Sequence, residues 1–341
     1  MLLSYSLADL QAAPAGQFLT PDPVCEQGVC VVIGNFDGVH RGHLALFEAA
    51  ARTGLPVVAV TFAPHPREVL SASAPPRLLS TDDRLQLLAS AGARHTLLIA
   101  FTREFAALDT DVFVRSILCE RLKMRKLVIG HDFSLGRGRS GNGDRLRELG
   151  AALGFDVMQL PCLLTPDGIP VSSTRIRDCL GAGDVQGAAN LLGRAHSVRG
   201  TVVHGFRRGH DLGFPTANLD PTVPGMEAIG LALPGVYATR VVIPGPDGTL
   251  PPISLTTRPV GPLEKGACVL PAVTSVGHNK TFGRNALSVE THIPNFSREL
   301  YDLPMELAFL YRLRDERKFN GIDELKAQIR RDTDQALRLA G

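Results

Sequence analysis

The chain has 341 residues, enough for two domains of ordinary size, and 44% of them are hydrophobic, as in most globular proteins. Its formal net charge of +2 is too small to indicate a general nucleic-acid binder. No apolar run reaches the roughly 18 residues that a membrane-spanning helix needs. Residues 1–10 lack the basic start and the apolar core of a signal peptide. We therefore expect a cytoplasmic protein without a membrane or nucleic-acid partner.

The first half of the chain alternates apolar runs with amphipathic stretches. The runs predict strands buried on both faces, and the amphipathic stretches predict helices. Such alternation is typical of a doubly wound α/β fold, in which helices cover both sides of a parallel sheet and ligands bind beyond the carboxyl ends of the strands. The predicted strands are residues 29–33, 55–62, 96–101, 126–129 and 156–160, and the predicted helices are 43–53, 82–90, 111–123 and 144–153.

The second half has short runs rich in Val, Thr, Tyr and Ile, separated by turn residues. This pattern predicts a small antiparallel β-barrel, closed by a helix over residues 322–339. We place the boundary between the domains near residues 183–194, after a helix opened by Ser173, which gives domains of 1–186 and 187–341. The Pro/Gly-rich residues 244–262 are expected to form a surface loop. The predicted strands are residues 198–204, 235–242, 269–276, 287–293 and 305–313.

Six cysteines are scattered along the chain, and no two of them form a C-x-x-C pair. That spacing is not typical of zinc ligands, and a chain of this length does not need a disulfide framework. We expect reduced thiols without a chemical role. The cysteines are Cys25, Cys30, Cys119, Cys162, Cys179 and Cys268.

A glycine-rich turn joins the first predicted strand to the first predicted helix. Residues 34–43 read GNFDGVHRGH. Glycines allow a close backbone approach to a ligand, and the amide groups at a helix start favour phosphate. His40 and His43 share one face of a helical turn, where they can donate hydrogen bonds to phosphoryl oxygens. A metal-binding or purely structural histidine pair is the alternative, but the position of the turn favours nucleotide binding.

Two further motifs indicate phosphate chemistry. Residues 172–177 read SSTRIR, in which a serine or threonine can cap a helix and Arg177 can grip phosphate in a bidentate manner. An ordinary helix cap with a solvated arginine is the alternative. Thr216 and Asn218 share a face of an extended segment and offer neutral oxygens that suit Mg²⁺, unless they only bond within a turn. Glu290 alternates with apolar neighbours on a predicted strand, a pattern that by itself is typical of a solvated surface residue.

These motifs resemble known families. Residues 34–43 resemble the H-x-G-H signature of nucleotidyltransferases, in the form found in the FMN adenylyltransferase half of bacterial bifunctional FAD synthetases. The sequences TFAPHP (61–66), HDFSLGRGRSGN (131–142) and SSTRIR resemble further motifs of that family, with Leu135 in place of an aromatic residue. The resemblance implies ATP contacts from Gly34, Asn35, Phe36, His40, His43, Ser173, Thr174 and Arg177, and flavin contacts from Phe62, His65, Pro66 and Asp132.

The second half is similar to riboflavin kinases. GFPTAN (213–218), GVYA (235–238), SVETH (288–292) and LRDERKF (313–319) match motifs of that family, while His210 and Lys280 replace a more usual arginine and proline. Residues 244–270 form a longer connection than is usual there. The resemblance implies Glu290 as the base for the ribityl 5′-hydroxyl. It also implies ATP contacts from Gly205, Gly213, Phe214, Pro215 and Thr216, flavin contacts from Glu290 and Arg314, and Mg²⁺ ligation by Thr216 and Asn218.

The resemblance implies a nucleotidyltransferase-type α/β domain followed by a barrel of the riboflavin kinase type. Riboflavin and ATP would give FMN and ADP, and FMN and ATP would give FAD and pyrophosphate, both with Mg²⁺. We expect only small-molecule partners and a monomer or weak homo-oligomer. One alternative is a chain with a single live activity, motivated by Leu135, His210 and Lys280. The other is a flavin-binding regulator or carrier, which would not need Thr216, Asn218, Glu290, His40 and His43 together.

Overall fold

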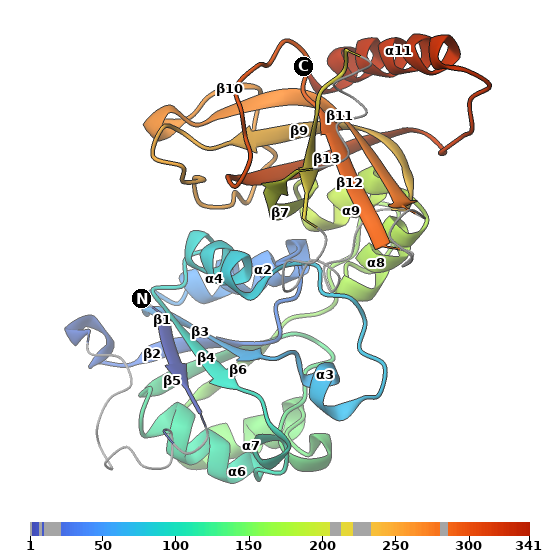
Figure 1. Ribbon diagram of the computed structural model, residues 1–341. Coiled ribbons are helices and arrows are strands. Elements are labelled where there is room, and N and C mark those ends of the chain that lie inside the picture. Colours follow the sequence, from blue (N-terminus) through green and yellow to red (C-terminus); the bar gives the residue numbers. More distant parts are fainter. Residues whose placement is uncertain (1, 7–8, 10–21, 205–212, 221–232, 280–285) are drawn as a thin grey trace. The chain divides into compact units, whose positions relative to one another are not determined.

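The computed structural model describes the chain except for residues 1, 7–8, 10–21, 205–212, 221–232 and 280–285. The chain forms two compact units (Figure 1). The first comprises Met1–Pro75 and Thr81–Ser172, and the second comprises Pro76–Ser80 and Ser173–Gly341. Pro76–Ser80 groups with the second unit, where Arg177 Nε donates to the Pro76 carbonyl (2.7 Å).

The first unit is built on one parallel sheet, in the strand order β1-β4-β3-β2-β5-β6. Its strands are β1 (Leu2–Tyr5), β2 (Val29–Ile33), β3 (Val57–Ala63), β4 (His95–Ala100), β5 (Met124–Ile129) and β6 (Asp156–Gln159). The intervening helices are α2 (Arg41–Ala51), α3 (Pro66–Leu70), α4 (Thr81–Ser90), α5 (Arg103–Ala106), α6 (Thr110–Val112), η2 (Phe113–Cys119) and α7 (Gly143–Leu153), with short turns at η1 (Pro23–Cys25) and η3 (Arg137–Arg139). The doubly wound α/β architecture is confirmed, and β1 is an edge strand that the sequence pattern did not predict.

The strand order indicates where a sheet of this type is expected to bind a ligand. From β2 the chain first extends the sheet on one side, through β3 and β4, and then on the other, through β5 and β6. Loops that follow the strands on either side of such a reversal diverge, and ligands bind between them beyond the carboxyl ends. The reversal lies between β2 and β5, so the loops after these two strands flank the crevice.

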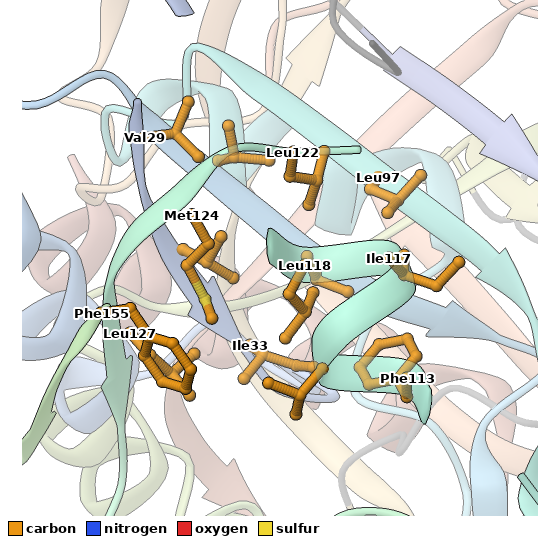
Figure 2. Close-up of a cluster of buried hydrophobic side chains, with 14 of the residues drawn as sticks. Val29, Ile33, Leu97, Phe113, Ile117, Leu118, Leu122, Met124, Leu127 and Phe155 are labelled. Carbon is orange, nitrogen blue, oxygen red and sulfur yellow. The ribbon is translucent and has the colours of Figure 1, made fainter. Parts of the chain in front are cut away.

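The α-helix expected over residues 111–123 is wrong in type, because Phe113–Cys119 is a π-helix. Hydrogen bonds that span five residues continue past its end, from Glu120 N–H to the Arg115 carbonyl (3.0 Å) and from Leu122 N–H to the Ile117 carbonyl (3.1 Å). An amphipathic pattern indicates that a helix has an apolar face, but it does not distinguish an α-helix from a π-helix. Figure 2 shows side chains of η2 packed in one cluster with those of β2, β4 and β5. The buried residues of η2 are Phe113, Val114, Ile117 and Leu118.

The second unit is an antiparallel barrel preceded by two helices and followed by a long one. Six strands close the barrel in the order β11-β12-β8-β7-β13-β9, with β9 pairing back to β11, and β10 adds a short pairing to β11. The expected barrel and C-terminal helix are confirmed. The elements are α8 (Ser173–Gly181), α9 (Val185–Leu192), β7 (His196–Val203), β8 (Thr216–Leu219), β9 (Gly235–Ile243), β10 (Gly261–Pro262), η4 (Glu264–Gly266), β11 (Cys268–Asn279), β12 (Ala286–His292), β13 (Pro304–Arg314) and α11 (Ile322–Ala340).

Residues 244–262 follow β9 as the surface segment that their composition predicts, and polar contacts anchor them to the barrel. Arg240 donates to the Arg258 carbonyl (2.7 Å), and Arg199 donates to the Pro251 carbonyl (2.9 Å). The segment and η4 together connect the end of β9 to the start of β11 at Cys268. Ser275, the partner of Glu290, lies seven positions further along β11, or about 23 Å at the rise of an extended strand. The segment is therefore at the opposite end of these strands from Glu290.

Helix α11 lies along the outside of the barrel, where it packs on β9, β11 and β13 (Figure 1). Ala336 and Ala340 pack with Val236, Ala238 and Val273 in one buried cluster. The small alanine side chains let the helix approach the strands closely, so apolar packing supplies much of the docking energy.

An ion pair also attaches α11 to the barrel. Asp332, 3% exposed, accepts hydrogen bonds from Arg314 Nε (3.0 Å) and Nη2 (2.8 Å), and Gln328 Nε2 donates to the same carboxylate (2.6 Å). We expect Asp332→Ala to destabilise the second unit by about 2–4 kcal/mol, because it leaves a largely buried guanidinium without its carboxylate. Asp334→Ala, on the exposed side of the same helix, should cost under about 0.5 kcal/mol.

Urea denaturation followed by near-UV circular dichroism measures this difference. The chain has no tryptophan, and three of its four tyrosines, Tyr237, Tyr301 and Tyr311, belong to the second unit, so the signal reports chiefly on that unit. Equal midpoints for the two variants would mean that the ion pair does not hold the helix.

Candidate functional site

The loop after β2 presents two stacked histidines. His40 is the N-cap of α2, and its Nδ1 accepts the His43 N–H (3.3 Å), while Nδ1 of His43 accepts the His40 N–H (3.3 Å). Their rings stack with centroids 3.6 Å apart and planes 15° from parallel. Because each Nδ1 accepts a backbone hydrogen bond, each neutral ring carries its proton on Nε2. Both side chains are thus set as Nε2–H donors, the state that suits phosphoryl oxygens.

A metal at this histidine pair lacks support in the described part of the chain. His40 and His43 do not form a group with a third His, Cys, Asp or Glu side chain there. A protein zinc site usually has three or four such ligands.

Buried side chains hold the backbone of this loop in an unusual conformation. Phe36 (φ 50°) and Val39 (φ 40°) occupy the left-handed region, although neither is glycine, and both are 0% exposed. Phe36 packs edge-on against His43, with ring centroids 5.3 Å apart. At Gly42 a Cβ atom would lie 3.2 Å from the His40 ring, so glycine leaves room for the stacked pair. A left-handed, non-glycine backbone costs energy, and core packing sustains it here.

The end of β3 and the loop after it contain three of the residues that are predicted to contact the flavin. A cis peptide bond joins Ala63 to Pro64, and His65 caps α3 by accepting the Arg67 N–H at Nδ1 (3.1 Å). Pro66 is the first residue of α3. Phe62 is 8% exposed, and its ring lies among those of other phenylalanines in the core. Its ring is therefore part of the core of the first unit.

An open hollow of about 390 Å³ lies at the carboxyl ends of β5 and β6. Its polar lining includes Asp132 from the predicted flavin site, whereas His40, His43 and His65 are not part of it. Leu135, which departs from the motif that residues 131–142 resemble, packs against the hydrophobic core and does not line the hollow. The lining residues are His131, Asp132, Phe133, Ser134, Arg139, Asn142, Gly143, Asp144 and Gln159.

The SSTRIR motif opens α8, which begins at Ser173 as expected. Thr174 is exposed, whereas Ser173 and Arg177 are partly buried in the second unit. Arg177 uses Nε to bind the Pro76 carbonyl. The helix has nine residues, enough for its first-turn amides to present a partial positive charge.

In the barrel, the predicted kinase residues lie on two paired strands. Glu290 of β12 is directly opposite Asn218 of β8, and His292 is opposite Thr216. Val289 and Thr291 are buried in the barrel, so the alternating Glu290 and His292 face outward, as the strand pattern predicts. The sequence did not predict β8 as a strand, yet this pairing brings Glu290 beside both proposed magnesium ligands.

Arg314 belongs to the same row of the barrel. The strand registers align Glu290 with Ser275, Ser275 with Val236, and Val236 with Arg314. Phe214 packs edge-on against His292, at 5.5 Å between ring centroids, and Pro215 accepts a hydrogen bond from His292 Nδ1 (2.9 Å). Gly213 has φ 85°, which favours glycine at that turn. Gly205, residues 207–212 and residues 280–283 lie outside the described residues.

The sequence patterns did not identify Arg84 of α4 as a buried residue next to the predicted site. Its side chain is 6% exposed and donates to the carbonyls of Asn35 (2.8 Å) and Phe62 (2.7 Å). An arginine in an amphipathic helix is normally assigned to the solvated face. Its position three and four residues before the buried Leu87 and Leu88 places it on the apolar face, and that spacing was the available signal.

A second polar cluster lies at the opposite, amino edge of the sheet. Asp22, Cys25 and His95 have potential metal-ligating atoms within 4.8 Å of one another. The Asp22 carboxylate already accepts hydrogen bonds from Arg94 Nε (2.5 Å) and His95 Nε2 (3.1 Å). The hydrogen bond from Arg94 is the main reason why the pKa of Asp22 is well below its usual range. We assign this cluster to anchoring the segment before β2.

Comparisons with known proteins also divide the chain into two parts, near the boundary between the two units. The FAD synthetase family model matches residues 22–175, and the riboflavin kinase family model matches residues 192–340. The bifunctional riboflavin kinase/FMN adenylyltransferase of Escherichia coli K12 is 34% identical over 312 residues, covering 90% of this chain and 91% of that protein. The protein of the same description from Bacillus subtilis is 30% identical over 319 residues, covering 90% and 91%.

A solved structure extends the likeness to three dimensions. A crystal structure from Streptococcus pneumoniae, described as a macrolide-efflux protein, matches with a TM-score of 0.78 and 26% identity, covering 98% of this chain and 99% of that one. Among the described residues of the present chain, no helix is both long and apolar enough to cross a membrane. With both family models matched in order and a relative 34% identical across nine-tenths of its length, the chain belongs to the family of bifunctional riboflavin kinase/FMN adenylyltransferases.

Proposed function

We propose that this chain phosphorylates riboflavin to FMN and then adenylylates FMN to FAD, using ATP in both reactions. The observation that supports it best is a separate polar site in each unit: the stacked His40–His43 pair in the first, and Glu290 beside Asn218 in the second. The catalytic domains are proposed as residues 1–186 and 187–341. We further propose that the protein works in the cytoplasm as a monomer or weak homo-oligomer.

In the adenylyltransferase reaction, a phosphate oxygen of FMN attacks the α-phosphorus of ATP, and the bond to pyrophosphate breaks. His40 and His43 donate Nε2–H hydrogen bonds to phosphoryl oxygens and stabilise the charge that builds up there. The loop of Gly34, Asn35 and Phe36 approaches the nucleotide through its backbone. Ser173, Thr174 and Arg177 of α8 are proposed as additional ATP contacts, because helix-start amides and a guanidinium both suit phosphate. Phe62, His65, Pro66 and Asp132 are proposed to contact the flavin.

In the kinase reaction, Glu290 orients the ribityl 5′-hydroxyl and accepts its proton while the γ-phosphoryl group is transferred and ADP leaves. Asn218 and Thr216 fit Mg²⁺, since they offer two neutral oxygen ligands on adjacent outward positions of one strand. When bound there, the ion would shield the phosphate charges during transfer. Gly205, Gly213, Phe214 and Pro215 are proposed to contact ATP, and Arg314 the flavin.

Chromatography of the products formed from riboflavin and Mg-ATP over time tests the proposal. We expect FMN to form first and FAD to follow, with one pyrophosphate for each FAD. FMN that never becomes FAD would refute the bifunctional assignment and leave a kinase alone. Tight flavin binding without ATP consumption would instead indicate a binding protein.

A further inference from the structure

Arg84 connects the two loops that carry the proposed ATP and flavin contacts. It lies in the first turn of α4, and one guanidinium donates through Nη1 to the Asn35 carbonyl (2.8 Å) and through Nη2 to the Phe62 carbonyl (2.7 Å). The Thr61 hydroxyl donates to the same Asn35 carbonyl (3.3 Å). Asn35 belongs to the loop after β2, and Phe62 leads into the loop after β3. Arg84 therefore bridges the two segments directly, and the Thr61 hydroxyl adds a second, longer contact to Asn35.

Arg84 connects the two segments just beyond the last paired residues of β2 and β3. Paired residues of β2 and β3 end at Ile33 and Val60, and the Gly34 N–H donates to the Val60 carbonyl (3.1 Å). Beyond this point β2 enters its loop, whereas β3 continues to Ala63, paired with β4 on its other side. Arg84 supplies the following cross-connection, with donors whose spacing is fixed by the planar guanidinium.

The choice of an arginine at this position has an energetic cost. A guanidinium that is 6% exposed loses most of its hydration, and apolar residues of similar volume often stabilise a core equally well or better. Leu87 and Leu88 follow on the same buried face of α4. An apolar residue could not donate the two hydrogen bonds that Arg84 makes to the carbonyls of Asn35 and Phe62.

We propose that Arg84 is a positioning residue for FMN adenylylation, which holds the nucleotide loop and the flavin loop at the separation needed for attack. The proposal rests on the function proposed above. Transfer requires the FMN phosphate and the ATP α-phosphate to be aligned, and misplacement of bound groups by about 1 Å can cost on the order of 10²-fold in rate. Arg84 acts on both substrates through the backbone and contacts neither reacting atom.

The test compares steady-state kinetics of Arg84→Met, Arg84→Lys and Arg121→Met. Arg121 is also buried, at 8% exposure, but precedes β5 at the amino end of the sheet, so it controls for removing a buried guanidinium. For Arg84→Met we expect KM for FMN and for ATP in adenylylation to rise at least about fivefold, and kcat to fall by about 10²-fold. Arg84→Lys keeps the charge but not the planar fork, so its constants should lie between those of wild type and Arg84→Met.

KM separates positioning from folding, since it does not depend on the fraction of molecules that are folded. A purely structural Arg84 would lower kcat and leave both KM values at the wild-type level, as we expect of Arg121→Met. That result for Arg84→Met would overturn the inference alone. Failure of the wild-type chain to make FAD would overturn the proposed function and the inference together. Riboflavin phosphorylation by each variant, expected at the wild-type rate, shows that the second unit is intact.

Discussion

Glu290→Gln is expected to slow riboflavin phosphorylation by about 10³-fold, within the range of roughly 10²–10⁴ that a general base contributes. The amide keeps the size and the outward position of the side chain on β12 but cannot take the hydroxyl proton. FMN adenylylation does not involve Glu290 in the proposed mechanism and should continue at the wild-type rate when FMN is supplied. Glu299→Gln, an equivalent change at an exposed position of the second unit, should alter neither reaction.

The two reactions are measured separately, with riboflavin and Mg-ATP for phosphorylation and with FMN and Mg-ATP for adenylylation. Glu290→Ala should also stop FMN formation while adenylylation persists. If either variant lost both activities, the assignment of one site to each unit would be wrong. If Glu290→Gln phosphorylated riboflavin at the wild-type rate, Glu290 would not be the base, and its place beside Asn218 would serve only magnesium binding or packing.

Local patterns were sufficient to predict most of the secondary structure. The run at Val29–Ile33 is fully buried on both faces, and its strand has the predicted bounds. The alternation around Glu290 correctly predicted which side chains face outward, because the period of a strand is a local property. The π-helix at Phe113–Cys119 could not be predicted in the same way, because its hydrogen-bond spacing depends on how its apolar face meets the sheet.

Contacts between distant segments were harder to predict. Asn218 and Glu290 are far apart in sequence, and only the β8–β12 register makes them neighbours. Arg314 carries a proposed flavin contact, but its ion pair with Asp332 requires α11 to fold back on the barrel. Arg84 likewise reaches the carbonyls of Asn35 and Phe62 only because the fold brings α4 beside the ends of β2 and β3. The sequence motifs therefore named groups that carry chemistry, while the side chains that hold them in place required the tertiary structure.

The histidine pair allows the structural and chemical roles of one residue to be separated. In His43→Asn the side-chain oxygen can occupy the position of Nδ1 and accept the His40 N–H, so the reciprocal cap of α2 is kept. The Nε2–H donor is lost. In His43→Ala both are lost.

We expect His43→Asn to lower kcat/KM for FMN adenylylation by about 10²–10³-fold, the usual cost of removing one preorganised donor to a developing negative charge. His43→Ala should lose at least as much activity and also about 1 kcal/mol of stability, the typical worth of a capping hydrogen bond. Thermal unfolding of the first unit, together with the rate of FAD formation from FMN, distinguishes the two variants. Riboflavin phosphorylation should be unchanged in both. Wild-type adenylylation by His43→Asn would mean that His43 serves only to cap the helix, because the variant retains the capping acceptor and loses the Nε2–H donor.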